Sequence, residues 1–275
     1  MALVPFPSPN KEPDDSEPWL ADGEDAQESE GKMSFLEHLD ELRKRLMYSA
    51  IALAVGVAIS FTFIDRVFRF IMQPLQRMLP AGGKLIYTEP TEAFVLYMKI
   101  ALLTGVIIAA PVIMWQVWLF IAPGLYQKEK RFAIPFVLLS SIGFVLGAAF
   151  THYLLFPWMW VFLASFGSSS DYLMFAPKIE SVFSLYTKML LGMGLVFQMP
   201  SVVFFLAKMG VVTARFLVRN IKYAILIIFV LAAVLTPSGD MLTQTLFAAP
   251  MIGLYFISIV IAWIFGKKTP KRGTD

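Results

Sequence analysis

Six apolar segments separated by polar stretches limit how this chain can fold. They cover about residues 47–64, 94–121, 132–156, 185–207, 221–236 and 245–265. A helix rises about 1.5 Å per residue, so about 20 apolar residues cross the roughly 30 Å hydrocarbon core of a bilayer. Only 16% of the residues are charged and 57% are hydrophobic, whereas soluble domains are roughly 25% charged. The sequence therefore predicts an all-α integral membrane protein with six transmembrane helices.

The distribution of lysine and arginine predicts the orientation of these helices. Basic clusters fall before the first segment, in every second connection and after the sixth segment: Arg43, Lys44, Arg45; Lys128, Lys130, Arg131; Lys208, Arg215, Arg219, Lys222; Lys267, Lys268, Lys271, Arg272. Cytoplasmic loops carry such an excess of positive charge. We expect a multi-pass protein of the cell inner (plasma) membrane with both termini in the cytoplasm.

The two ends of the chain differ in composition from its body. The first 30 residues carry nine acidic residues and one lysine, which predicts a disordered acidic cytoplasmic tail over residues 1–32. It has neither the basic start nor the apolar stretch of a signal peptide. Residues 33–266 form the predicted membrane domain, and 267–275 form a basic cytoplasmic tail.

Order is expected to begin at Ser34. Ser34 and Glu37 have the spacing of a capping box. Leucines at positions 36, 39, 42 and 46 then recur every three or four residues among charged residues, which predicts an amphipathic helix. We expect this helix to lie on the membrane surface before the first span.

Several segments depart from the length of a regular span. The run from Phe132 to Phe166 is too long for one span, so it projects from the membrane or breaks near Pro157. The fifth span, between Lys222 and Pro237, is short and would thin the bilayer. Prolines 111, 135, 200 and 250 lie inside spans and favour kinks. We expect a concave wall of kinked helices with an extended outer cap and short fifth and sixth spans.

The composition excludes several classes of chemistry. The chain has no cysteine, so disulfides, zinc–thiolate sites and thiol catalysis are excluded. His38 and His152 are too far apart for a local metal motif. No G-x-x-x-x-G-K-[ST] loop occurs, and neither H-E-x-x-H nor a paired set of intramembrane aspartates is present. We expect no enzyme activity, no cofactor, no metal and no nucleic-acid partner.

A secondary transporter for a small solute is the main alternative from another functional class. Kinked spans and polar intramembrane residues would suit it, but it predicts symmetry between the halves of the chain. The long outer loop over residues 65–93 has no counterpart in the second half. This asymmetry disfavours the alternative.

Eight short motifs along the chain occur in an order that is specific to one family. They are H-L-D-E-L-R-K-R-L (38–46), Q-P-L (73–75), A-P-V-I (110–113), Q-V-W-L-F-I-A-P-G-L-Y (116–126), K-E-K-R (128–131), F-Q-M-P (197–200), L-T-P-S-G-D (235–240) and Q-T-L (244–246). With the six-span frame, this pattern resembles the TatC family, the multi-span subunits of the twin-arginine protein translocase. The resemblance covers about residues 33–265.

The resemblance implies a core receptor subunit for the transport of folded proteins. It would bind twin-arginine signal peptides on the cytoplasmic face, with transport driven by the proton gradient. The implied partners are folded cargo proteins, single-span TatA- and TatB-type subunits, further copies of this chain in a larger complex, and the lipid bilayer.

The resemblance also implies that Glu41 and Glu129 bind the signal peptide. A guanidinium group binds a carboxylate through two parallel hydrogen bonds, which lysine cannot reproduce. From the residues alone, Glu41 could instead pair with Arg45 one turn later, and Glu129 could be a solvated loop charge. The family match favours the binding role for both.

Further positions match the implied recognition surface. Arg43 would orient the carboxylates or serve as a basic membrane anchor. Phe120 and Tyr126 flank a Pro-Gly pair and would wall the surface, unless they belong to an interfacial aromatic belt. Leu42 completes this predicted surface.

Within the membrane, Gln198 is expected near the middle of the fourth span. Its amide could bond the carbonyl four residues before Pro200, and it would face the concave interior or hold helices together. Many family members carry glutamate at this position, so glutamine argues against a charged group at that depth. Lys188, on the same span, can extend its amine to the membrane surface and is assigned no function.

Three positions match the region where the family docks its single-span partners, namely Thr236, Gln244 and Asp240. The T-P-S-G-D stretch is one residue longer than the common family form. Pro74 and Pro111 are predicted to have structural roles. Pro74 would shape an outer cap or occupy a turn.

Overall fold

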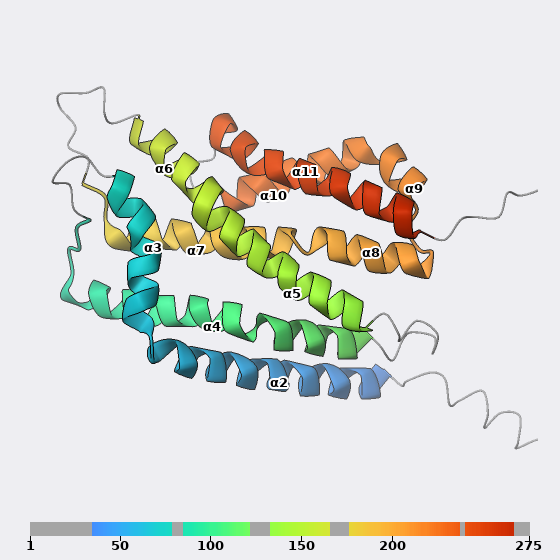
Figure 1. Ribbon diagram of the computed structural model, residues 1–275, viewed down its shortest axis with the longest axis horizontal. Coiled ribbons are helices and arrows are strands. Elements are labelled where there is room, and N and C mark those ends of the chain that lie inside the picture. The colour runs from blue at the N-terminus through green and yellow to red at the C-terminus, as the bar shows by residue number, and fades with distance from the viewer. Residues whose placement is uncertain (1–34, 79–84, 122–132, 166–175, 237–239, 267–275) are drawn as a thin grey trace, which may run out of the picture. The chain divides into compact units, whose positions relative to one another are not determined.

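The computed structural model describes residues 35–78, 85–121, 133–165, 176–236 and 240–266, and these form helices almost throughout (Figure 1). Five helical stretches are long and apolar enough to cross a membrane, and Ile221–Leu235 is a shorter apolar helix. The five are Leu36–Phe61, Pro90–Ile121, Ile134–Ser165, Ile179–Met209 and Met241–Phe265. The six stretches overlap the six predicted segments in order, which confirms an all-helical, multi-span chain. The two predicted tails lie outside the described residues.

Helix α2 (Phe35–Phe61) joins two segments that the sequence analysis separates. It is one helix, so the prediction of a distinct surface helix before the first span is wrong. No glycine or proline occurs between Leu36 and Val55 to interrupt it. Ser34 lies outside the described residues. The chain divides into two compact units, Met1–Arg43 and Lys44–Asp275, and the packing described below lies within the second.

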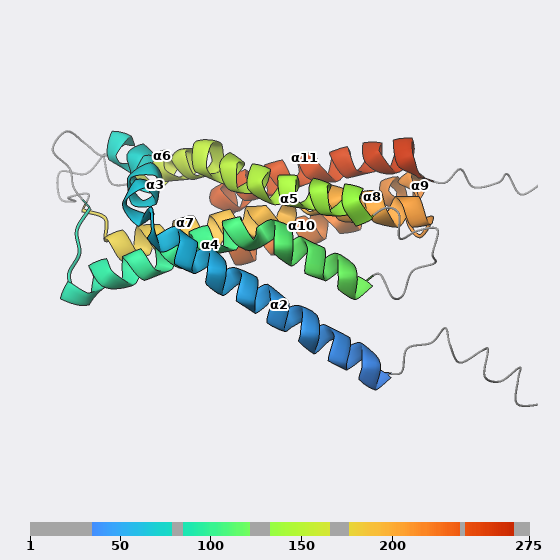
Figure 2. The same ribbon diagram turned by 60° about the horizontal axis from the view of Figure 1, so that its bottom comes forward.

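Helix α3 (Ile64–Met78) lies where the sequence predicts a long outer loop. Ile71, Met72 and Leu75 are buried on one face, whereas Arg69 and Gln76 are exposed. Their spacing of three and four residues is that of an amphipathic helix. The helix packs against α4 (Pro90–Ile121) and α6 (Phe156–Ser165) (Figures 1 and 2).

The two structural prolines lie inside helices. Pro74 is within α3, so the expectation that it occupies a turn is wrong. Pro111 is within α4, which continues through it as a single helix of 32 residues. Each proline removes one main-chain donor without ending its helix.

The long third apolar run continues past Pro157 instead of breaking there. It consists of α5 (Ala133–Phe150), the π-helical segment η3 (Thr151–Leu155) and α6. Phe156 donates its N–H to the carbonyl of Thr151, five residues earlier. At about 1.5 Å per residue this stretch is roughly 50 Å long and exceeds the hydrocarbon core. The predicted break near Pro157 is therefore wrong, and projection from the membrane stays a prediction.

The predicted fourth span consists of two helices, α7 (Ile179–Val196) and α8 (Met199–Met209). Pro200 lies in the first turn of α8, where its missing N–H costs no helical hydrogen bond. Gly210 ends α8 with φ of 85°, a left-handed conformation that favours glycine. The break between the helices therefore falls at Phe197 and Gln198.

The C-terminal helices differ in length. Helix α9 (Ala214–Arg219) precedes α10 (Ile221–Leu235), whose 15 residues span roughly 22 Å. Helix α11 (Met241–Phe265) has 25 residues and packs along α8, α9 and α10 (Figures 1 and 2). A short sixth span is therefore wrong, because α11 begins directly after its cap at Asp240. The fifth span is short, as predicted.

Helices α2 and α4 approach closely where both carry glycine. A Cβ atom added to Gly56 would lie 2.6 Å from the carbonyl oxygen of Gly105. One added to Gly105 would lie 2.6 Å from Cγ2 of Val57. Small residues let membrane helices approach to backbone contact, and here both helices contribute one.

Candidate functional site

The predicted signal-binding residues are only partly within the described chain. Glu41 lies on α2 and is half-buried, and Leu42 and Arg43 follow it as exposed residues. Phe120 is half-buried in the last turn of α4. Glu129 and Tyr126 lie outside the described residues. The pairing of Glu41 with Glu129 therefore stays a prediction.

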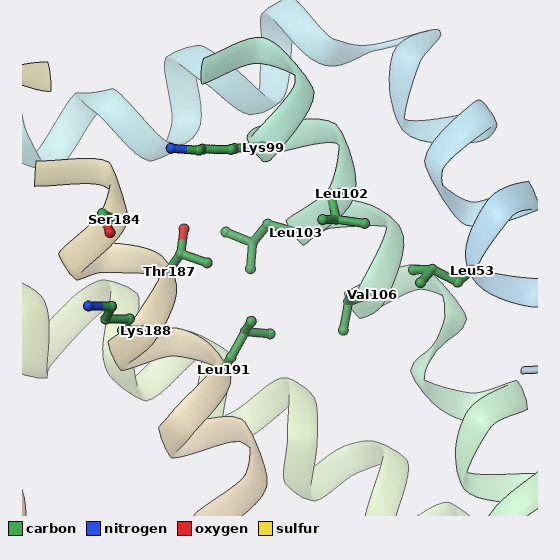
Figure 3. A pocket seen from close by; sticks show the side chains of 9 residues that line it. All are labelled: Leu53, Lys99, Leu102, Leu103, Val106, Ser184, Thr187, Lys188 and Leu191. Atoms are coloured by element: carbon green, nitrogen blue, oxygen red, sulfur yellow. The ribbon is translucent and has the colours of Figure 1, made fainter. Parts of the chain in front are cut away.

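A groove of about 400 Å³ opens between α2, α4 and α7 (Figure 3). Its lining residues are Leu53, Lys99, Leu102, Leu103, Val106, Ser184, Thr187, Lys188 and Leu191. Most of this surface is aliphatic, but two lysines and two hydroxyl groups interrupt it. No local sequence pattern predicts this groove, because its lysines come from two helices and lie about 90 positions apart.

Two ion pairs join α4 to the start of α7 beside this groove. Lys99 Nζ lies 3.1 Å from Glu180 Oε1, and Lys178 Nζ lies 2.8 Å from Glu92 Oε1. The Glu92 side chain is only 4% exposed and also accepts hydrogen bonds from the N–H and hydroxyl of Thr88. Its carboxylate raises the pKa of Lys178 by accepting a hydrogen bond from the ammonium group. These contacts place the first turns of α4 and α7 side by side.

A short main-chain pairing supports the same junction. Ile86 donates its N–H to the carbonyl of Pro177 at 3.1 Å, and Ile179 donates to the carbonyl of Ile86 at 2.9 Å. Ile86 and Lys178 thereby form a parallel β-bridge. Helices α4 and α7 thus start at the same end of the bundle and run in the same direction.

Gln198 links two helices. Its Nε2 atom lies 3.0 Å from the carbonyl oxygen of Ser140 on α5 and 3.4 Å from that of Gly194 on α7. The predicted acceptor, the carbonyl four residues before Pro200, is therefore not the one it uses. The break between α7 and α8 turns the amide toward α5 instead. A helix-linking role accounts for this geometry.

The predicted partner-docking residues lie around the connection between α10 and α11, and each has an internal hydrogen bond. Gln244 donates from Nε2 to the carbonyl of Phe229 on α10 at 2.8 Å. Thr236 is buried and donates its hydroxyl to Ala233 at 3.3 Å. Asp240 caps α11 by accepting the N–H of Thr243 at 2.8 Å and its hydroxyl at 2.6 Å.

His152 is a buried residue without an assigned role. It lies in the π-helical segment η3, with Nδ1 3.1 Å from the Tyr186 hydroxyl of α7. Its ring stacks on Phe70 of α3 at 4.3 Å between centroids. In the described part of the chain, no group of three or more His, Cys, Asp or Glu side chains could hold a metal ion.

Comparison with known proteins gives a consistent result. Residues 37–250 match the family model described as Sec-independent protein translocase protein (TatC). The chain is 46% identical over 239 residues to the TatC protein of Desulforapulum autotrophicum, covering 87% of each chain. It is 39% identical over 252 residues to that of Koribacter versatilis, covering 90% of this chain and 91% of the relative.

A solved structure agrees with these relatives in fold. The crystal structure described as the twin arginine translocase receptor TatC superposes with a TM-score of 0.72 at 39% identity. The match covers 82% of this chain and 98% of that one. With the motifs, the helices and the length of the match in agreement, the chain belongs to the TatC family of Sec-independent protein translocase proteins.

Proposed function

We propose that this chain is the receptor subunit of a twin-arginine translocase and binds the paired arginines of signal peptides at the cytoplasmic face of the membrane. The family match over residues 37–250 carries this proposal. The similarity to a solved twin-arginine translocase receptor supports it. As a family of multi-pass translocase proteins, TatC proteins are not enzymes, and the chain acts by binding.

Glu41 and Glu129 are the proposed ligands of the two arginines. Each carboxylate can accept two parallel hydrogen bonds from one guanidinium group. This pairing fixes the orientation of the arginine side chain as well as neutralising its charge. Arg43 would orient these carboxylates, and Leu42, Phe120 and Tyr126 would contact the apolar residues that follow the arginine pair. The proposal is supported by the family motifs that contain Glu41 and Glu129, and by the basic clusters that predict a cytoplasmic position for both segments.

The proposed partners are single-span TatA- and TatB-type subunits, and further copies of this chain in a larger complex. They would dock near Thr236, Gln244 and Asp240, beside the short helix α10. The chain has no nucleotide-binding loop, and the family match implies that the proton gradient would supply the energy for moving the cargo. The cargo would be folded proteins with R-R signals.

The shape of the membrane domain forms part of this proposal. Kinked helices would make a concave wall, with α3 and the projecting end of α6 forming an outer cap. Helix α10 would thin the bilayer, because its 15 residues reach roughly 22 Å. Depth-resolved labelling of Lys222 and Leu235 tests this point. Both residues are expected at headgroup depth, and finding either of them inside the hydrocarbon core would contradict thinning.

Photo-crosslinking of a signal peptide to membranes that contain the chain and its partners tests the binding site. Glu41→Ala and Glu129→Ala are each expected to weaken crosslinking about tenfold, because each removes a charge-assisted hydrogen-bonded pair. Glu37→Ala is the matched control, since Glu37 is an exposed glutamate one turn earlier on α2. Undiminished binding by the double variant Glu41→Ala, Glu129→Ala would overturn the assignment.

Export of a folded reporter tests the function as a whole. In cells that lack their own receptor subunit, the chain should restore export of a reporter with an R-R signal and not of one with K-K. Lysine supplies the charge without the bidentate geometry. If the chain restored export equally well with R-R and K-K signals, another function, such as solute transport, would be favoured.

A further inference from the structure

The groove between α2, α4 and α7 has two chemically different sides (Figure 3). Lys99, Ser184, Thr187 and Lys188 gather on one side of the view, and Leu102, Val106 and Leu53 lie on the other. Along α4, Lys99 precedes the aliphatic residues by one to two turns, and along α7 the polar residues precede Leu191 in the same way. The lining contains two cations and no acidic side chain.

Two of the polar side chains have unused bonding capacity. Thr187 Oγ1 is buried and has no hydrogen-bond partner among the described residues. Lys188 is exposed and forms no ion pair within the described chain. Lys99 differs, since Glu180 lies 3.1 Å from it outside the groove lining. A buried hydroxyl without a partner costs free energy that a ligand can recover.

The positions of the two lysines along their helices place them at a membrane interface. From Lys99 to the end of α4 at Ile121 are 22 residues, or roughly 33 Å. From Lys188 to the end of α8 at Met209 are 21 residues, or roughly 32 Å. Both distances match the roughly 30 Å thickness of the hydrocarbon core. If the far ends of α4 and α8 lie at one interface, both lysines lie at the other.

Beyond these lysines, the start of each helix is polar. Glu92, Lys178 and Glu180 form the ion pairs described above within the preceding two to three turns. Charged networks of this kind belong in water or among headgroups. The aliphatic part of the groove therefore lies at acyl-chain depth, and its cationic part lies at headgroup depth.

We propose that this groove binds an anionic phospholipid. Its phosphate would accept hydrogen bonds from Lys188 and Lys99, and from the Thr187 hydroxyl once that side chain rotates toward the groove. An acyl chain would lie along Leu102, Leu103, Val106 and Leu191. Charge complementarity selects an anion, since basic pockets between membrane helices suit lipid phosphates. The basic region of a signal peptide would be repelled by the same lysines. This lipid site is separate from the proposed receptor site.

Native mass spectrometry of the full chain tests the proposal without any signal peptide. The delipidated protein is titrated with phosphatidylglycerol or phosphatidylcholine of identical acyl chains, and phosphatidylglycerol is expected to bind about tenfold more tightly. Lys188→Gln should lower phosphatidylglycerol affinity about fivefold and phosphatidylcholine affinity less, because choline already offsets the charge of that phosphate. Lys99→Gln should act in the same direction. Lys222→Gln is the matched control, because Lys222 is an exposed lysine on α10 outside the groove.

Two further variants separate headgroup from acyl-chain contacts. Thr187→Val keeps the shape of the side chain and removes its hydroxyl, so it should weaken both phospholipids, which share the phosphate, by about threefold. Diacylglycerol with the same acyl chains has no phosphate, and its binding should not change. Val106→Trp fills the aliphatic side and should weaken the binding of all three lipids. Equal affinity of the wild type for the two phospholipids, or a full preference for phosphatidylglycerol in Lys188→Gln, would overturn the proposal.

The identity of the occupant is tested in intact membranes. A photoreactive residue at Leu102, an exposed residue of the groove lining, should give a phospholipid adduct both with and without a signal peptide. An adduct with the peptide in place of lipid would assign the groove to the cargo and refute the lipid site. Because the receptor proposal is tested at Glu41 and Glu129, failure of either proposal is distinguishable from failure of the other.

Discussion

Gln198 donates a hydrogen bond from its side-chain amide to the main-chain carbonyl of Ser140, with 3.0 Å between Nε2 and the oxygen. The bond joins the break between α7 and α8 to the middle of α5. Glycines make this contact possible: a Cβ on Gly147 would lie 2.7 Å from the carbonyl oxygen of Met193. One on Gly143 would lie 3.0 Å from that of Phe197. The amide thus bridges two backbones that are already close.

Replacing Gln198 by methionine should destabilise the protein. The substitution keeps the length of the side chain and removes the donor to Ser140, at an expected cost of about 1 kcal/mol in the free energy of unfolding. Thermal unfolding in detergent measures it as a lower midpoint. Gln76→Met, at an exposed position on α3, should leave the midpoint unchanged. An equal midpoint for Gln198→Met and the wild type would show that the bond contributes nothing measurable.

The contact between α2 and α4 gives a prediction with a built-in control. Gly56→Ala and Gly105→Ala should each lower stability by about 1–3 kcal/mol, because the new methyl group overlaps backbone or Val57. Gly253→Ala, on α11, meets no atom within 4 Å. Alanine there should raise stability by up to about 1 kcal/mol through its higher helix propensity. Thermal unfolding of the three variants in one detergent checks the opposite signs.

Equal destabilisation by all three alanine variants would contradict the contact. It would mean that these helices tolerate no alanine for reasons unrelated to the approach of α2 and α4. Gly56→Ala combined with Gly105→Ala provides a second check. The two effects should not be additive, since either methyl group alone already separates the helices.

The apolar segments could be predicted from the sequence, because a membrane span requires an uninterrupted run of apolar residues. Helix α3 was missed for the same reason. Its charged residues and Pro74 resemble a loop, and only the spacing of Val67, Phe68, Ile71, Met72 and Leu75 indicates a helix with one buried face. The position of the break in the fourth span depends on which part of the helix accommodates the missing N–H of Pro200. The sequence pattern alone does not determine that position.

The candidate sites were predictable to a different extent. Motifs identified Gln198 and Gln244 as noteworthy, but their acceptors, Ser140 and Phe229, lie 58 and 15 positions away. No local pattern encodes such pairs. Lys188 was read as an isolated cation, because its neighbour in the groove, Lys99, comes from another helix. Spatial pairing across helices is therefore the information that the sequence did not supply.

The ion pair between Glu92 and Lys178 predicts a defined pH dependence. In the folded protein, the hydrogen bond to the Glu92 carboxylate raises the pKa of Lys178 above the ordinary lysine value of 10.5. The stabilisation from this shift is therefore present in full below that value and is lost as the pH rises through the raised pKa. Glu92→Gln should be less stable than the wild type by a constant amount between pH 7 and about 9, and the difference should shrink above about 10.5.

Thermal unfolding at a series of pH values measures this difference. Asp65→Asn is the control, because Asp65 is an exposed acidic residue on α3 and is not one of the groups that raise the pKa of Lys178. It should follow the wild type closely over the whole range. If the loss of stability in Glu92→Gln relative to the wild type grew above pH 10.5, this ion pair would not be its cause.

Asp240 allows a capping role to be separated from a docking role. It accepts the N–H and hydroxyl of Thr243 at the start of α11, and loss of such a cap costs about 1 kcal/mol. Asp240→Ala should therefore lower the unfolding midpoint, whereas Asp240→Asn keeps a good cap and should retain it. If the charge also contacts a single-span partner, Asp240→Asn should lose co-purification of that partner while remaining stable. If capping is its whole role, Asp240→Asn should match the wild type in both measurements, and docking would then rest on Thr236 and Gln244.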